Sequence, residues 1–439
     1  MANRIVIIGG GFGGLACAKE LGNADCVVTI IDRRNHNLFQ PLLYQVATAA
    51  LSPADIAEPI RKTLGRYRNI NMLMAEVVGI DPSAKHVLLD HGGKVEYDRL
   101  VIATGSDYNY FGRDDWRRLA PGMKTLHEAR LVRQRLLLAF EQAELTTDPD
   151  IQRDLLTFVV IGGGPTGVEM AGAISELGRF MIDRDFRNLQ AEQFRVILLE
   201  AGPRLLAAFP EKLSSYAAAY LERIGVQVRV GQRVLEVTSE GVQLQSEFIT
   251  TGCVVWGAGV KPSPASKWLG LTEDRAGRIP VDGNLHVTGF DEIYALGDTA
   301  LTIGTDGKPL PGLAQVAKQQ GIYLGQFLKP GTRSAQPFVF KNRGSTAVIG
   351  RNAAVFDFGS WTLRGRLAWL LWAFVHVYLL VNFEKRILVS IQWISRYITR
   401  QRSARIIDEH QSELDANDVV QKNQIVGLPA SLLRKGESR

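Results

Sequence analysis

Two stretches of the chain share one pattern of hydrophobic and polar positions. Residues 4–14 have the sequence RIVIIGGGFGG, and residues 156–167 have the sequence LTFVVIGGGPTG. In each, an apolar run followed by GxGxxG predicts a buried strand, a tight turn and the start of a helix. The copies are about 150 residues apart, which is too far for a solenoid repeat. The pattern therefore indicates duplication of a whole βαβ domain.

The rest of the apolar pattern predicts alternating strands and helices. Charges interleave with leucines over residues 123–145, as in an amphipathic helix, and another helix is expected from about Leu313. Two of the expected strands end in the sequences ATG and GAG. The further strands are expected at 27–31, 95–106, 196–200, 227–230 and 253–260.

The composition changes after residue 338. Strand-like pieces at 346–349 and 354–358 precede a tryptophan-rich apolar run at 367–383, and a basic segment follows. We predict an α/β protein with two Rossmann-like dinucleotide-binding domains plus a C-terminal membrane-anchoring helical region. The predicted boundaries are 1–112 with 283–337, then 113–282, then 338–408, and a polar tail at 409–439.

Composition and charge narrow the class of protein. The 439 residues are 46% hydrophobic and 22% charged, which is ordinary for a globular chain of several domains. The net charge of +6 concentrates beside the apolar C-terminal run, so we expect a membrane surface as partner and no nucleic acid. The three cysteines have no CxxC or metal-ligand spacing, so we expect no metal and no disulfide scaffold. The N-terminus lacks a signal-peptide pattern, so most of the protein should remain in the cytosol.

The first glycine motif supplies a complete dinucleotide site. Gly9, Gly11 and Gly14 occupy the GxGxxG positions, and the helix that follows offers unpaired N–H groups to a pyrophosphate. Asp32 ends the next strand, where a carboxylate accepts hydrogen bonds from a ribose. Strand, glycines, helix and acid occur in the required order, so we interpret this motif as the FAD site.

The second motif repeats the set, and we assign it to a nicotinamide dinucleotide. Its glycines are followed by Glu200, whose charge favours the 2′-hydroxyl of NADH over the 2′-phosphate of NADPH. Arg204 lies four residues further on and would weaken that preference. The glycines at the GxGxxG positions are Gly162, Gly164 and Gly167.

Two acidic residues each allow two interpretations. Glu169 is either a first-turn helix residue favoured by the dipole or a group at the meeting point of nicotinamide and flavin. Asp298, in IYALGD, either closes a turn or contacts the ribityl chain of FAD, and the N-terminal glycine motif favours the second. We expect Thr104, Gly105 and Gly259, from the ATG and GAG strand ends, to line the cofactor sites.

These features together resemble the two-dinucleotide-binding flavoproteins typified by glutathione reductase. Disulfide reductases carry a cysteine pair after the first motif, whereas residues 36–51 (HNLFQPLLYQVATAAL) contain none. This stretch, IGGGPTGVEMAGAISEL, WGAGV at 256–260 and LAQVAKQQG at 313–321 resemble the type II NADH:quinone oxidoreductases. The last of these matches the AQxAxQ quinone-site motif of that family.

The resemblance implies non-covalent FAD, NADH as substrate and a quinone as acceptor, without proton pumping. It places Glu169 near the junction of nicotinamide, flavin and quinone, and Gln315 and Gln319 at the quinone. The two glutamines share one helix face, so their amides can donate to a quinone carbonyl, although glutamines at this spacing are usually solvated. Asp32 stands where the family often has Glu. A soluble ferredoxin-type NAD(P)H reductase and a signalling or scaffold flavoprotein remain alternatives.

The run LAWLLWAFVHVYLLVNF (367–383) contains no charge and would span about 25 Å as one helix. A buried helix, a single transmembrane span and monotopic attachment through two helices are the alternatives. We favour monotopic attachment at the cytoplasmic face of the inner membrane, because the next segment alternates apolar and basic faces. His376 is interpreted as a polar group at the interface rather than part of a quinone entrance. A homodimer is left open.

Overall fold

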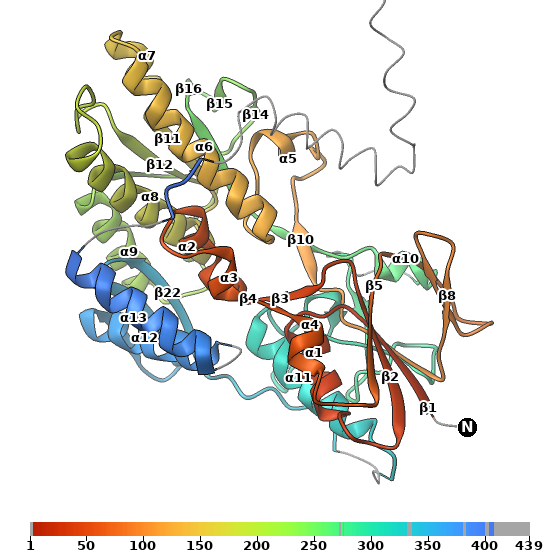
Figure 1. Cartoon of the computed structure of the whole chain (residues 1–439). Coiled ribbons are helices and arrows are strands. Elements are labelled where there is room, and N and C mark those ends of the chain that lie inside the picture. Colours follow the sequence, from red (N-terminus) through yellow and green to blue (C-terminus); the bar gives the residue numbers. More distant parts are fainter. Residues whose placement is uncertain are drawn as a thin grey trace, which may run out of the picture.

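The computed structural model describes residues 3–271, 274, 276–331, 336–380, 383–399 and 404–407. Two α/β units lie side by side, and a C-terminal unit packs against both (Figure 1). This bears out the predicted α/β fold with two Rossmann-like units. The predicted tail at 409–439 lies outside the described residues.

The first unit is built on a five-stranded parallel sheet of order β20-β9-β1-β2-β5. β20 (Ile293–Ala295) comes from late in the chain, so the sheet joins two distant segments. Helices α1 (Phe12–Glu20) and α11 (Ala314–Phe327) pack together so closely that a Cβ at Gly321 would lie 2.1 Å from a backbone oxygen. The other strands are β1 (Asn3–Ile8), β2 (Cys26–Asp32), β5 (Ile70–Met74) and β9 (Arg99–Ile102).

The second unit repeats the plan with a four-stranded parallel sheet of order β13-β12-β11-β17. The helix expected over 123–145 begins three residues later, at Leu126, because Thr125 caps it by accepting the N–H of Glu128. The strands are β11 (Thr157–Ile161), β12 (Arg195–Glu200), β13 (Val226–Val230) and β17 (Cys253–Trp256). The helices are α6 (Leu126–Leu145), α7 (Pro149–Leu155), α8 (Pro165–Arg184) and α9 (Glu211–Arg223).

Both units also contain short helices and strands that the apolar pattern did not predict. The expected single strand over 95–106 is wrong, because it divides into β8 (Lys94–Glu96), β9 and β10 (Ser106–Tyr108). The segment after the first motif forms β3 (His36–Leu38), η1 (Gln40–Leu42), α2 (Leu43–Ala47), α3 (Pro53–Ile56), β4 (Ala57–Pro59) and α4 (Ile60–Leu64). The remaining small elements are β6 (Val77–Asp81), β7 (His86–Leu89), α5 (Trp116–Leu119), β14 (Glu236–Val237), β15 (Gly241–Gln243), β16 (Phe248–Thr250), α10 (Ala265–Trp268), β19 (Ile279–Pro280), η2 (Gly297–Thr299) and β21 (Ala300–Leu301).

Two antiparallel strands join the units. β10 leaves the first sheet and pairs with β18 (Val260–Pro262), which returns from the second sheet. The expected continuous strand over 253–260 is therefore also divided, at the glycines after Trp256. The crossing brings the ATG and GAG strand ends to one place.

The C-terminal unit is a three-stranded sheet covered by two helices. β22 (Ser345–Gly350), β23 (Ala353–Asp357) and β24 (Thr362–Gly365) precede α12 (Arg366–Leu379) and α13 (Phe383–Thr399). β22 lies against α8, where a Cβ at Gly172 would meet the oxygen of Ile349 at 1.8 Å. The expectation of one helix over 367–383 is wrong: α12 ends before Leu380, which turns into the core and is 1% exposed.

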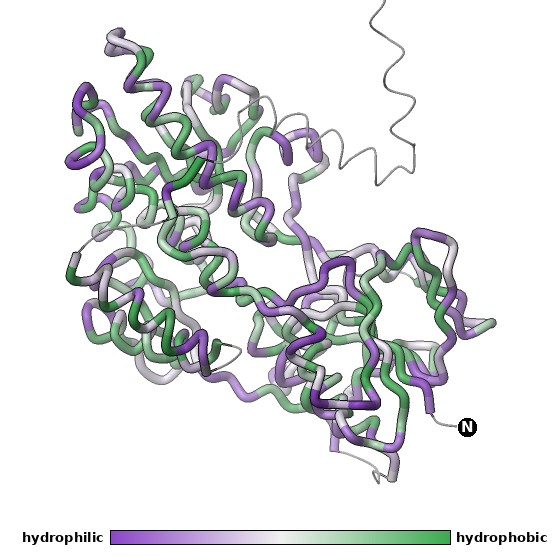
Figure 2. The backbone as a smooth tube through the Cα atoms, in the orientation of Figure 1, coloured by the Kyte–Doolittle hydropathy of each residue, from purple (hydrophilic) through white to green (hydrophobic). Residues whose placement is uncertain are grey.

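Apolar side chains fill three clusters. The largest joins the second sheet to α2, α6, α8 and the inner sides of α12 and α13, while two smaller clusters flank the first sheet. In Figure 2 the strands of both sheets are predominantly hydrophobic and the connecting loops predominantly polar. The C-terminal unit is thus part of the main core.

Candidate functional site: two dinucleotide sites and their junction

The first glycine turn fits a pyrophosphate. Gly9 has φ +104°, and a Cβ there would lie 2.4 Å from the oxygen of Ala103, so the strand–turn–helix crossing requires glycine. A Cβ at Gly14 would lie 1.9 Å from the oxygen of Gly9. A Cβ at Gly11, by contrast, would meet nothing within 4 Å. Among the described residues no protein group fills the space beside Gly11, at the start of α1, where a phosphate binds in this fold.

Asp32 stands at the end of β2, as predicted. Its Oδ2 accepts the N–H of Gly10 at 2.6 Å, and its Oδ1 accepts the N–H of Arg34 at 2.8 Å. The turn therefore fixes the carboxylate, and each oxygen keeps a further lone pair for a ribose hydroxyl. Asp32 has a shorter side chain than the Glu that the family often has at this position, and its carboxylate still reaches the glycine turn.

The second turn repeats this geometry. Gly162 has φ +108°, a Cβ at Gly167 would lie 1.8 Å from the oxygen of Gly162, and Gly164 again has nothing within 4 Å. Glu200 accepts the N–H of Gly163 and of Gly202, each at 2.6 Å. Two dinucleotide cradles of one design therefore occur in one chain.

Arg204 does not face Glu200. Its guanidinium donates to the carbonyls of Phe209 at 2.8 Å and Ala207 at 2.7 Å, beyond the turn. These bonds hold the cation on the backbone of its own loop. The expectation that Arg204 weakens the preference for NADH has no support in this geometry.

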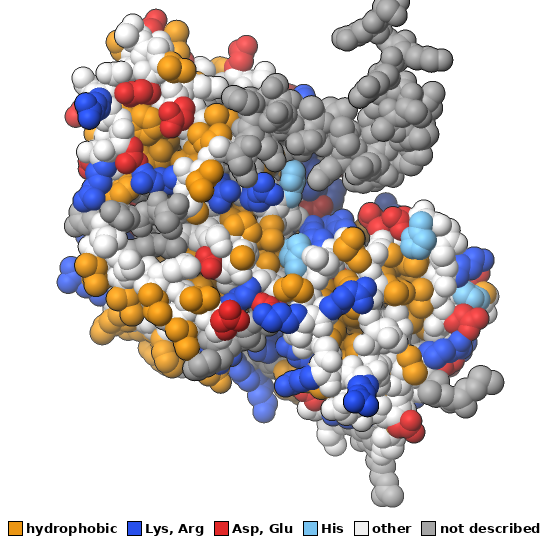
Figure 3. Space-filling model, in the orientation of Figure 1, with side chains coloured by type: hydrophobic (Ala, Val, Ile, Leu, Met, Phe, Trp, Pro, Cys, Tyr) orange, Lys and Arg blue, Asp and Glu red, His pale blue; other side chains and the backbone are white. Residues whose placement is uncertain are grey.

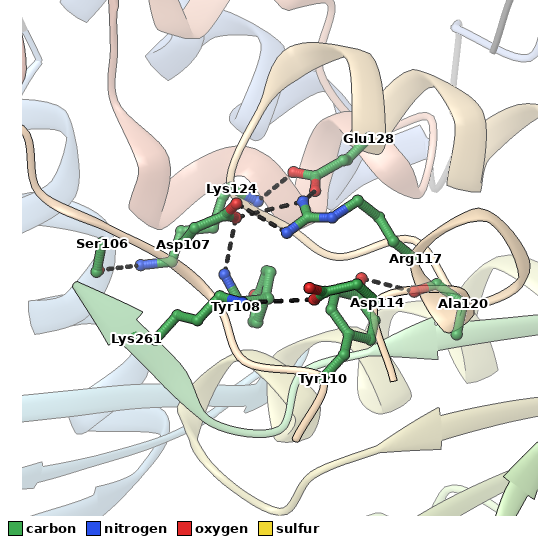
Figure 4. A network of polar contacts seen from close by, with 10 residues as sticks. All are labelled: Ser106, Asp107, Tyr108, Tyr110, Asp114, Arg117, Ala120, Lys124, Glu128 and Lys261. Carbon is green, nitrogen blue, oxygen red and sulfur yellow. Dashed lines mark hydrogen bonds and ion pairs between the residues drawn. The ribbon is translucent and has the colours of Figure 1, made fainter. Parts of the chain in front are cut away.

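The ATG and GAG strand ends meet where the units cross. Thr104 Oγ1 lies 2.5 Å from Ser263 Oγ, while Gly105 (φ +68°) has open space around its Cα. Gly259 (φ +69°) approaches Phe111, whose ring a Cβ would meet at 2.9 Å. Beside this crossing, Figure 4 shows a polar network that links β10 to the turn before α6.

Asp298 follows β20 in the first unit, and its Oδ2 accepts a hydrogen bond from Ser106 Oγ at 2.6 Å. The turn before it is held by Gln320, which is 1% exposed, accepts the N–H of Gly297 at 2.7 Å and donates to Thr302. A cavity of about 140 Å³ opens beside Asp298, Ser106 and Gln320. The sequence analysis missed Gln320, although its position in a polar QQG run on a helix against the glycine turn was a signal.

Gln315 and Gln319 lie on one face of α11 and hold the same segment of backbone. Gln315 donates to the oxygen of Gly344 at 3.0 Å and accepts the N–H of Arg343 at 3.1 Å. Gln319 exchanges two 3.0 Å bonds with the backbone of Lys341. The glutamines are partly exposed, but their amides also bond the backbone of residues 341–344, which lead into β22.

Glu169 is the fifth residue of α8 and lies against β22, so it is beyond the first turn, where the helix dipole would favour an acid. Its Oε1 accepts the N–H of Val348 at 3.4 Å. Burial raises the pKa of Glu169 to about 8, and the Val348 bond opposes this only weakly. The site thus holds a carboxylic acid that is mostly protonated at neutral pH, one strand away from the segment held by the two glutamines.

The C-terminal helices present a continuous apolar face to solvent. In Figure 3 hydrophobic side chains gather over α12 and α13, at the lower left. None of the helices among the described residues combines the length and apolarity that crossing a bilayer requires. The most exposed apolar residues on these helices are Leu367, Leu370, Phe374, Tyr378, Ile387, Leu388, Ile391, Ile394, Tyr397 and Ile398.

The opposite side of these helices docks on the segment after the first motif. Lys385 forms an ion pair with the buried Glu58 at 3.0 Å, and Trp393 donates to Gln45 at 2.9 Å. His376 is 7% exposed and stacks on Trp372 at 4.4 Å. The interpretation of His376 as an interfacial polar group is therefore wrong. It faces the core, where desolvation lowers its pKa to about 4.

Cys17, Cys26 and Cys253 are all free and buried. Burial raises the pKa of each thiol. None lies in a pair, so none supplies the dithiol centre that a disulfide reductase uses. This leaves the dinucleotides themselves to carry the redox chemistry.

Comparison with known proteins gives a consistent result. Residues 3–321 match the pyridine nucleotide-disulphide oxidoreductase family, and residues 342–402 match the family described as NDH2 C-terminal domain. The chain is 38% identical over 427 residues to the type II NADH:quinone oxidoreductase Ndh of Mycobacterium tuberculosis, covering 93% of this chain and 91% of the relative. It is 29% identical to the mitochondrial internal alternative NAD(P)H-ubiquinone oxidoreductase A1 of Arabidopsis thaliana, over 92% and 86% of the two chains.

A solved structure has the same fold. The structure of NDH2 from Plasmodium falciparum in complex with NADH superposes with a TM-score of 0.83 at 22% identity, over 93% of this chain and 100% of that one.

Proposed function

The chain belongs to the type II NADH:quinone oxidoreductases, and from this premise we propose how its residues carry out the reaction. It oxidises NADH and passes two electrons through FAD to a quinone. The single observation that carries this function is the pair of complete dinucleotide cradles in a chain whose three cysteines are buried and unpaired. A quinone then takes the place that a disulfide has in the disulfide reductases.

We assign FAD to the first cradle and NADH to the second. FAD, when bound, accepts a hydride from NADH and passes the two electrons on to the quinone. Asp32 and Asp298 are the acidic contacts of FAD, and Gly11 leaves room for its pyrophosphate. The other residues assigned to FAD are Gly9, Gly14, Thr104 and Gly105. Those assigned to NADH are Gly162, Gly164, Gly167, Glu200 and Gly259.

NADH is preferred over NADPH because the charge of Glu200 is fixed and Arg204 does not neutralise it. Both oxygens of Glu200 are fixed by backbone N–H groups, so the carboxylate cannot swing away from a 2′-phosphate. Arg204 is committed to two carbonyls and does not neutralise that charge. A 2′-phosphate would then face a fixed carboxylate whose charge Arg204 does not offset.

Glu169, Gln315 and Gln319 form the quinone side of the junction. Reduction of a quinone by NADH also consumes one proton, and a protonated carboxyl with a pKa of about 8 supplies it at neutral pH. Gln315 and Gln319 fix residues 341–344 and keep a second amide N–H each to donate to a quinone carbonyl. We expect no proton pumping, because these groups serve a scalar reaction at one site.

The apolar face of α12 and α13 docks on the membrane that holds the quinone. Arg366 begins α12, and Lys385 and Arg386 lie near the start of α13, so basic side chains flank the apolar face as in monotopic helices. We propose the cytoplasmic face of the inner membrane as the site of this attachment. We keep the domain boundaries as a proposal, with FAD bound by 1–112 and 283–337 and NADH by 113–282. Homodimer formation stays a prediction, which light scattering tests by measuring the molar mass of the protein in solution.

The test is NADH oxidation by the purified flavoprotein in vesicles that contain ubiquinone, menaquinone or plastoquinone. Quinol formation is expected with at least one of them. A lumen that acidifies or alkalinises beyond scalar proton uptake would contradict the absence of pumping. Reduction of a ferredoxin in preference to every quinone would favour the soluble reductase instead.

A further inference from the structure

Lys124 lies between the two dinucleotide units, in the turn before α6. Its Nζ donates a hydrogen bond to Ser106 Oγ at 2.9 Å, and Ser106 donates in turn to Asp298 Oδ2 at 2.6 Å. One hydroxyl therefore joins the ammonium group to the carboxylate that we assign to FAD. Figure 4 shows this contact as a dashed line at the edge of the network.

The backbone around Lys124 is tightly held. Its N–H donates to Glu128 Oε2 at 2.9 Å, and the N–H of Glu128 donates to Thr125 in the cap of α6. Gly122 packs on the ring of Tyr108, which a Cβ would meet at 2.2 Å. The turn thus fixes the direction in which the lysine side chain leaves the backbone.

The nearby acids have other partners. Asp107 pairs with Arg117 at 2.7 Å, and Glu128 lies 3.5 Å from the same guanidinium. Across the described residues, the hydrogen-bond partner of the Lys124 ammonium is the neutral hydroxyl of Ser106. Burial lowers the pKa of Lys124, and the charges of Asp298, Asp107 and Glu128 oppose that shift. Ser106 is thus the direct hydrogen-bond partner of this cation, Asp298 is the largest of the three opposing charges, and the Tyr108 ring lies 5.9 Å from Nζ.

We propose that Lys124 is a positioning residue for FAD: acting through Ser106, it holds Asp298 in place and makes reduction of the bound cofactor more favourable. The proposal rests on the proposed function, because it takes Asp298 as a FAD contact. Reduction by NADH delivers two electrons and so adds negative charge at the site. A cation in a poorly solvated place stabilises such charge more than it would in water. Ser106 and Asp298 both line the cavity of about 140 Å³, so this charge acts where a ligand has access.

The experiment is a spectroelectrochemical titration of the flavin in the purified holoenzyme. Lys124→Met is expected to lower the ratio of reduced to oxidised flavin at a given potential at least tenfold, about 30 mV for a two-electron couple. Lys124→Arg keeps the charge and should restore most of the potential. Ser106→Ala should lower the potential too, and the double variant should lie no lower than Lys124→Met, because both changes break one chain of bonds.

Lys261→Met is the matched control. Lys261 lies on β18 in the same network, but it is exposed and pairs with the exposed Asp114 at 3.4 Å (Figure 4). Its removal takes the same charge from the same crossing and should leave the flavin potential unchanged. If the flavin potential shifts equally in Lys124→Met and Lys261→Met, the shift reflects only the loss of one positive charge, and the proposal is overturned.

An unchanged potential in Lys124→Met with flavin bound also overturns it. If Lys124→Met is purified without flavin, titration of the folded apoprotein with FAD replaces the potential. A Kd raised at least tenfold then supports the proposal, and a wild-type Kd overturns it. Wild-type protein that binds no flavin would refute the proposed function instead, so the two failures are distinguishable.

Discussion

Glu169→Gln is the sharpest perturbation of the junction, because it keeps the size of the side chain and removes its titration. With a pKa of about 8, the ratio of protonated to ionised carboxyl is about 10:1 at pH 7 and about 1:10 at pH 9. If the protonated form supplies the proton, kcat for quinone reduction in the wild type falls about tenfold between these pH values. In the variant kcat is lower at pH 7 and nearly independent of pH.

The assay separates the two half-reactions by stopped flow. NADH is first mixed with the oxidised enzyme, and a quinone analogue is then mixed with the reduced enzyme, across the pH range. The alkaline fall belongs to the second step only, because transfer of hydride from NADH takes no proton from Glu169. A fall confined to the first step would contradict this assignment.

The matched control is Glu176→Gln. Glu176 lies two turns further along α8 and accepts the N–H of Arg351 in the same C-terminal sheet. It shares the helix and the contact with the sheet, so Glu176→Gln should keep the alkaline fall near pH 8. The reasoning is refuted if Glu169→Gln keeps that fall as well.

The pH dependence of folding stability gives a second test of the raised pKa of Glu169. Its pKa in the folded protein lies above the ordinary value of 4.5. Between these two pKa values the folded state therefore holds a proton that the unfolded chain has released, and the free energy of unfolding falls as pH rises through this window. Denaturant titrations of Glu169→Gln should show a weaker decline over the same window, and an identical decline would argue against a raised pKa.

Three further changes test the remaining assignments. Glu200→Ala should lower the preference for NADH over NADPH, in kcat/KM, at least roughly tenfold, and an unchanged ratio would contradict the role of this carboxylate. Gln319→Leu removes both bonds to Lys341, so the free energy of unfolding should fall by about 1–3 kcal/mol while KM for quinone rises and reduction by NADH stays intact. Phe374→Ser is expected to weaken sedimentation with anionic vesicles roughly tenfold or more, whereas Phe248→Ser, in the sheet of the second unit, should not.

The dinucleotide cradles could be predicted from the sequence because their geometry is local. A glycine with φ above +100° between a strand and a helix is required by the turn itself. Asp32 and Glu200 were predictable for the same reason, since each ends the strand next to its turn and accepts a glycine N–H. These contacts depend on neighbouring elements of one βαβ unit.

The junction could not be predicted in the same way, because it is made of contacts between distant segments. Ser106 and Asp298 are 192 positions apart, and Glu169 and Val348 are 179 apart. No periodicity in the sequence indicates that the side chains of Gln315 and Gln319 would form hydrogen bonds with the backbone of residues 341–344. Hydropathy also misplaced the end of α12, because Leu380 is as apolar as its neighbours although its backbone is no longer helical.

The central claim is that electrons from NADH reach a quinone through one FAD per chain. The most direct measurement is the stoichiometry of NADH consumed to quinol formed by the purified flavoprotein in quinone-containing vesicles without oxygen. The account predicts equal amounts of the two, with FAD bound and without any added protein carrier. NADH oxidation that leaves the quinone oxidised, or no NADH oxidation by the FAD-loaded protein, would contradict it.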